Sequence, residues 1–148
     1  MTKAETLEAI EKAKAAHISQ MDKMKAAFRG TTIENPTSVS KMHCTFGKWL
    51  YGENNDFIKT ILGAHFYEQL DHEHEAWHAE YSKIHALLFE AKKEGFFAKV
   101  FSSKKPDTLA IDKAKTYYVE MEMITKQLLT TLDKSIRRIG AMDPSKFS

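Results

Sequence analysis

The residues best suited to chemistry in this chain are its histidines and its single cysteine. The 148-residue sequence holds seven histidines, and two of them, His74 and His78, are four positions apart. On an α-helix, side chains at positions i and i+4 lie on the same face, with Cβ atoms about 5–6 Å apart. Two imidazoles in that arrangement can bind one metal ion, so the pair is a candidate metal-binding element. The alternative is a pair that has this spacing by chance.

His17 and Cys44 are the candidates for the remaining ligands. His17 falls on the inward stripe of an expected helix, where a buried imidazole needs partners for both ring nitrogens. Cys44 opens a short aromatic-rich segment, and a helix N-terminus at that point favours the thiolate. Three imidazoles and one thiolate suit tetrahedral Zn²⁺ better than Mg²⁺ or Ca²⁺. The alternatives are a hydrogen-bonded core histidine at position 17 and a small buried hydrophobic residue at position 44.

Helices must position these residues, because apolar side chains recur at steps of three and four along most of the chain. We expect long helices over residues 2–29, over residues 58–93 with a break near Gly63, and from Asp107 to Gly140, and a short helix within 43–52. Together, residues 1–148 are predicted to form one all-α domain, an antiparallel four-helix bundle of three long helices and one short helix carrying the cysteine. An antiparallel neighbour would bring His17 level with the histidine pair.

Composition limits the classes of function. The formal net charge is +2, and acidic and basic residues are interleaved, which predicts neither a nucleic-acid-binding stripe nor a polybasic membrane patch. No apolar run approaches the roughly 18 residues that span a bilayer, so we expect no membrane insertion. One cysteine cannot form an intramolecular disulfide, and the N-terminus lacks a signal-peptide core. We therefore expect a cytoplasmic protein.

Three motifs in order resemble the chemoreceptor zinc-binding (CZB) domain family. They are the early helical His17, the segment CTFGKWLYG at residues 44–52, and His74-x-x-x-His78. The resemblance covers about residues 13–94, and it implies that His17, Cys44, His74 and His78 are zinc ligands. It also implies a homodimer and a role in bacterial signal transduction, with chemoreceptor, chemotaxis or diguanylate cyclase partners. The chain shows neither a receptor signalling hairpin nor a cyclase motif, so it is either a stand-alone member or an excised domain.

Two forms of sensing fit this resemblance. In the first, a hypochlorous-acid-type oxidant converts the zinc-bound Cys44 thiolate to a sulfenate, and the short helix is released. In the second, zinc occupancy itself is the signal, because loss of the metal loosens the bundle. A structural zinc site in an interaction module is a further alternative.

Two other classes of metalloprotein share part of the pattern. A hemerythrin-like or di-iron protein needs Glu-x-x-His on two helices, and only Glu75-Ala76-Trp77-His78 supplies it. His74-Glu75-Ala76-Trp77-His78 also matches the HExxH of metalloproteases, in which Glu75 would be the general base. Four protein ligands would leave no position for catalytic water, so we expect a protein that is not an enzyme.

The remaining polar residues near these motifs receive weaker predictions. His43, His65 and His72 are expected on the surface, and His85 is expected to be a core histidine or a neighbour of the site. Asp71 and Glu75 either orient ligand imidazoles or are solvated helix charges.

Overall fold

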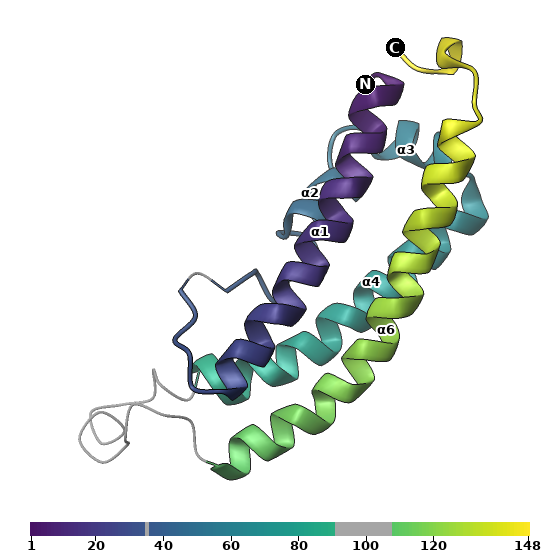
Figure 1. The fold of residues 1–148 in the computed structure, drawn as a ribbon. Helices are drawn as coiled ribbons and strands as arrows, with labels where there is room; N and C mark the ends of the chain where they lie inside the picture. Colours follow the sequence, from purple (N-terminus) through teal and green to yellow (C-terminus); the bar gives the residue numbers. More distant parts are fainter. Residues whose placement is uncertain (35, 91–107) are drawn as a thin grey trace.

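The first long helix, α1 (Lys3–Phe28), begins where the sequence supplies a capping box. The Thr2 hydroxyl accepts the Glu5 backbone N–H, and the Glu5 carboxylate accepts the N–H of Thr2 in return. The buried face of α1 follows the predicted stripe and includes Ile10, His17 and Met24. The computed structural model describes residues 1–34, 36–90 and 108–148 of the chain (Figure 1).

The middle of the chain contains two short helices and one long one. They are α2 (Thr45–Leu50), α3 (Asn55–Leu62) and α4 (Ala64–His85), and α4 continues into a π-helical turn at Ala86–Glu90. The predicted break near Gly63 is confirmed, because this glycine has φ +80°, which only a residue without a side chain adopts readily. The expected helix end at Lys93 and the expected helix start at Asp107 lie outside the described residues.

The last long helix, α6 (Thr108–Gly140), runs antiparallel to both α1 and α4. The Lys3 ammonium at the start of α1 donates to the carbonyl of Gly140 at the end of α6, and Lys14 pairs with Asp133. A 3₁₀ turn at Pro144–Lys146 follows. The all-α bundle predicted from the sequence is confirmed, and no strand occurs among the described residues.

One detail of the expected arrangement was wrong. Since α1 and α4 are each antiparallel to α6, they run in the same direction as each other, as Figure 1 shows. The connection after α1, together with α2 and α3, carries the chain back so that α4 can start near the level at which α1 starts. His17 therefore meets the histidine pair across two parallel helices.

The core lies between α1, α4 and α6, and α2 and α3 close one side. On α6, Tyr118 and Thr125 are buried, while Tyr117 and Ile124 are half-buried. No helix in the described part of the chain is long and apolar enough to cross a bilayer. Within this apolar interior the structure also buries several polar side chains: Thr6, His17, Gln20, Glu73, His74, His78, Thr125, Thr131 and Ser135.

Candidate metal centre

His17 enters the site from the middle of α1. Its imidazole is 4% exposed, and Nδ1 lies 2.7 Å from the backbone carbonyl oxygen of Ala13, one turn earlier. A carbonyl only accepts, so Nδ1 carries the proton and Nε2 keeps its lone pair. The α1 backbone thus holds this histidine in a tautomer that leaves Nε2 available to a metal.

His78 is held in the same tautomer by a different carbonyl. Its Nδ1 donates to the backbone oxygen of Val39, 2.9 Å away in the connection between α1 and α2. Its Nε2 is buried and has no hydrogen-bond partner. An unpaired buried acceptor is costly, which indicates that something other than the protein satisfies this nitrogen.

His74 lies one turn before His78 on α4 and is fully buried. Its Nδ1 is 3.3 Å from the Tyr51 hydroxyl, whose proton goes to Asp71 Oδ1 at 2.6 Å. Since that proton is used, the Tyr51 oxygen accepts from His74 Nδ1, and His74 Nε2 keeps its lone pair, with Cys44 Sγ 3.3 Å away. All three histidines therefore protonate Nδ1.

The three imidazoles converge. The possible ligand atoms of His17, His74 and His78 lie within 4.8 Å of one another, and all three side chains are buried. This group is the one cluster of three or more metal-ligating side chains among the residues with a described placement. The sequence prediction that these distant histidines come together is therefore confirmed, whereas their binding of a metal stays a prediction.

Cys44 adjoins this group through His74. Its Sγ lies 3.3 Å from His74 Nε2, close to the roughly 3.5 Å that separates sulfur and nitrogen ligands of one tetrahedral zinc ion. Cys44 is the N-cap of α2, and Sγ accepts the backbone N–H of Gly47 at 3.2 Å. A Cβ at Gly47 would lie 1.6 Å from the Lys41 carbonyl oxygen, so only glycine fits the turn that presents the sulfur.

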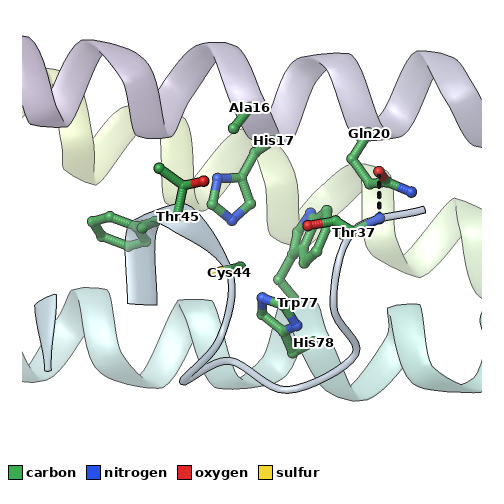
Figure 2. Close-up of a pocket in the computed structure, with 9 residues that line it drawn as sticks. Ala16, His17, Gln20, Thr37, Cys44, Thr45, Trp77 and His78 are labelled. Atoms are coloured by element: carbon green, nitrogen blue, oxygen red, sulfur yellow. Dashed lines mark hydrogen bonds between the residues drawn. The ribbon is translucent and has the colours of Figure 1, made fainter. Parts of the chain in front are cut away.

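A cavity of about 30 Å³ lies beside these groups (Figure 2). It is comparable to the volume of one water molecule, so it can hold a single ion but not an organic cofactor. Figure 2 shows His17 reaching it from α1, Cys44 from the turn before α2, and His78 from α4. Its lining residues are Ala16, His17, Gln20, Thr37, Cys44, Thr45, Phe46, Trp77 and His78.

Burial sets the charge state of the imidazoles. Loss of water lowers the pKa of His74 to about 2, with repulsion from His78 and His17 adding to the effect. The same loss of water lowers the pKa of His78 to about 4 and also lowers that of His17. All three are neutral at physiological pH, which is the form that binds a metal.

Burial also acts on the cysteine, and its effect outweighs the one predicted from the helix N-terminus. We expected the helix N-terminus to favour the thiolate, but burial raises the pKa of Cys44 above its usual value. The N–H of Gly47 opposes this effect without overcoming it. Protein groups alone therefore leave a neutral thiol, and a bound cation would be needed to stabilise the anion.

The two acidic residues expected to orient ligands behave differently from each other. Asp71 does not touch a ligand imidazole, but it accepts the Tyr51 hydroxyl that contacts His74, and Lys41 pairs with it at 2.9 Å. The Glu75 side chain is 66% exposed and faces Lys41, at 3.6 Å. Tyr51 is the residue that sequence reasoning missed, although its motif was recognised.

The other histidines lie apart from the cavity. His43, His65 and His72 are exposed, as predicted. His85 is half-buried, and its Nδ1 lies 3.2 Å from Glu90 Oε1, outside the cluster of three. The candidate ligand histidines are thus buried, whereas the remaining histidines are exposed or half-buried.

Comparison with known proteins agrees with the site. Residues 17–85 match the family model of the chemoreceptor zinc-binding domain, and this segment runs from His17 to the end of α4. It includes all four candidate ligands. No curated protein and no solved structure matches the chain.

Proposed function

Because residues 17–85 match the family model of the chemoreceptor zinc-binding domain, we propose that the protein binds one Zn²⁺ and acts as a cytoplasmic sensory module in bacterial signalling. His17, Cys44, His74 and His78 are the proposed ligands. The observation that carries this proposal is the common tautomer of the three histidines. Each donates Nδ1–H to a protein oxygen and keeps the Nε2 lone pair for a cation.

The donor set favours zinc over other metals. Nitrogen and sulfur donors without a carboxylate suit Zn²⁺, and four protein ligands are typical of zinc sites that serve structure or regulation. Glu75, the general base of the HExxH reading, lies on the exposed side of α4 and does not line the cavity. Glu73, one residue before His74, is buried but bonds to Thr131 on α6. Neither position supports a protease or a di-iron centre.

Cys44 is the residue through which an oxidant would act. A two-electron oxidant such as hypochlorous acid transfers oxygen to the thiolate, giving sulfenic acid and chloride. When bound, zinc would hold the sulfur as the reactive thiolate. Cys44 is also the N-cap of α2, so a change at sulfur disturbs the start of that helix. This coupling favours the oxidant-sensing form of the proposal over sensing of zinc level alone.

Metal analysis of the purified full chain tests the zinc proposal. We expect one zinc per chain, and we expect the His17→Ala, His74→Ala, His78→Ala and Cys44→Ser variants to lose or weaken it. His72→Ala and His43→Ala are matched controls, because these exposed histidines neighbour His74 and Cys44 in sequence. A wild-type chain that takes up no zinc would refute the proposal.

The two forms of sensing need a second measurement. Zinc release on addition of hypochlorous acid is followed with a chromogenic chelator, in wild type and in Cys44→Ser reloaded with zinc. Release from the wild type alone supports oxidant sensing. Equal release from both proteins removes the redox form and leaves zinc occupancy as the signal.

Chemoreceptor zinc-binding domains act in signalling proteins, so a chemotaxis component or a diguanylate cyclase is the proposed class of partner, with a homodimer as the proposed assembly. Sedimentation of the purified chain tests the dimer directly.

A further inference from the structure

Both ends of the short helix α2 contact the same imidazole. Cys44 is the N-cap of α2, and its Sγ lies 3.3 Å from Nε2 of His74. Tyr51 is the C-cap, and its hydroxyl oxygen lies 3.3 Å from Nδ1 of that ring. The rings of Tyr51 and His74 are also stacked, with planes 22° apart and centroids 6.1 Å apart. The two caps of this six-residue helix thus contact both ring nitrogens of His74.

The direction of each hydrogen bond along this chain of groups is determined. Asp71 is an acceptor and lies 2.6 Å from the Tyr51 oxygen, so the phenol proton points to the carboxylate. The Tyr51 oxygen can then only accept from His74, which places the imidazole proton on Nδ1. Lys41 fixes the far end, since its Nζ lies 2.9 Å from the same Asp71 oxygen and 5.2 Å from the centre of the Tyr51 ring.

The same lysine joins this hydrogen-bonded chain to the cysteine. The backbone oxygen of Lys41 lies 3.6 Å from Cys44 Sγ, while its side chain reaches Asp71 on α4. Lys41 therefore contacts both the sulfur of Cys44 and the carboxylate that aligns Tyr51. The two other histidines lack such an arrangement, because they are oriented by backbone carbonyls that no side-chain substitution removes.

The geometry points to Tyr51 as a positioning residue of the metal centre, aligned by Asp71, which fixes the tautomer and orientation of His74 and thereby sets zinc affinity. The inference rests on the proposed zinc function. It assigns to the third aromatic residue of the CTFGKWLYG segment a role distinct from packing. Groups that orient metal-ligating histidines change metal affinity by about 10- to 100-fold when they are removed.

Tyr51→Phe is the test, because it removes one oxygen and keeps the stacked ring. We expect its zinc dissociation constant, measured by competition with a chromogenic chelator, to rise by about 10- to 100-fold. Tyr67→Phe is the matched control. Tyr67 is also half-buried, its hydroxyl also has a side-chain partner, Asn55, and a lysine also lies 5.2 Å from its ring centre, but it does not contact a proposed ligand. This control should bind zinc as the wild type does.

A second readout separates positioning from general destabilisation. In zinc-free protein, ¹⁵N NMR of the histidine side chains reports which ring nitrogen carries the proton. We expect His74 to be the Nδ1–H tautomer in the wild type and in Tyr67→Phe. In Tyr51→Phe the Nε2–H tautomer should become populated, because Nδ1 has lost its acceptor and Nε2–H can donate to Cys44 sulfur. His17 and His78 should keep their tautomers in every variant.

Asp71→Asn provides an independent variant on a partly exposed side chain. It removes the charge that holds Lys41 and aligns the phenol, and we expect a smaller loss of zinc affinity than for Tyr51→Phe. Unchanged affinity together with an unchanged His74 tautomer in Tyr51→Phe would overturn the inference. A wild type without zinc affinity would instead refute the proposed function, and the tautomer of His74 would still decide whether Tyr51 orients the ring.

Discussion

Two faces of α4 bury polar residues at adjacent positions, and they do so in opposite ways. His74 and His78 face α1 and α2, whereas Glu73 and Trp77, each one residue earlier, bond to α6. Trp77 Nε1 donates to the Thr125 hydroxyl at 3.0 Å, and Glu73 Oε1 accepts from Thr131 at 3.0 Å. The second oxygen of Glu73 has no protein partner, but the first also accepts from Gln69.

The difference lies in what satisfies each polar atom. On the α6 face, Trp77 Nε1 and Glu73 Oε1 are joined to hydroxyls on the neighbouring helix, so they contribute to packing specificity. On the other face, acceptor nitrogens point toward one another around a small cavity, an arrangement that is unfavourable without a cation. Burial alone thus does not distinguish a structural polar residue from a ligand. The direction of its free lone pairs does.

Removal of zinc should produce the largest effect, and only on the histidine face. Structural zinc sites contribute on the order of 10 kcal/mol of binding free energy that is coupled to folding. We expect a strong chelator to lower the free energy of unfolding in urea by several kcal/mol. The Thr125→Val variant should show the same chelator response as the wild type, because its hydroxyl bonds to Trp77 and not to a ligand. If the chelator left the free energy of unfolding unchanged, the two faces would not differ in their dependence on a metal.

The zinc-free protein should lose stability in acid. Burial lowers the pKa of His78 from 6.5 to about 4 and that of His74 to about 2, so the unfolded chain binds protons that the folded chain does not. Stability should therefore be constant above pH 6.5 and fall as the pH decreases toward about 4. The slope is about 1.4 kcal/mol per pH unit for each buried histidine.

Urea unfolding between pH 7 and 4 measures this slope. His78→Ala should make it shallower, whereas exposed His72→Ala should leave it unchanged. An identical slope in the wild type and His78→Ala would mean that His78 is protonated in the folded state, contrary to its burial.

The α6 face should respond to loss of single hydroxyls by a smaller amount. Thr125→Val and Thr131→Val each remove a hydrogen-bond partner from a buried group, which should cost about 1–3 kcal/mol of unfolding free energy. Zinc affinity should stay close to that of the wild type, since neither threonine lines the cavity. A loss of zinc affinity as large as that of a ligand variant would show that the two faces are not independent.

The smallest effect is expected outside both faces, at His72. This residue is exposed and precedes Glu73 directly. His72→Ala should change the unfolding free energy by less than about 0.5 kcal/mol and leave zinc content unchanged. A larger change, measured by the same unfolding and metal assays, would place His72 in one of the two networks.

The sequence determined the elements and the identity of the candidate ligands. Helical periodicity, glycines at helix ends and the i, i+4 histidine pair are local properties, so the helices, the break at Gly63 and the residues His17, Cys44, His74 and His78 could be predicted without coordinates. The tertiary structure decided what depends on contacts between distant segments. These are the parallel course of α1 and α4, the net effect of burial on the Cys44 thiol, and the hydrogen bonds of Tyr51 and Glu73. Such features follow from which groups lose water and which partner each group meets, and no local pattern encodes that.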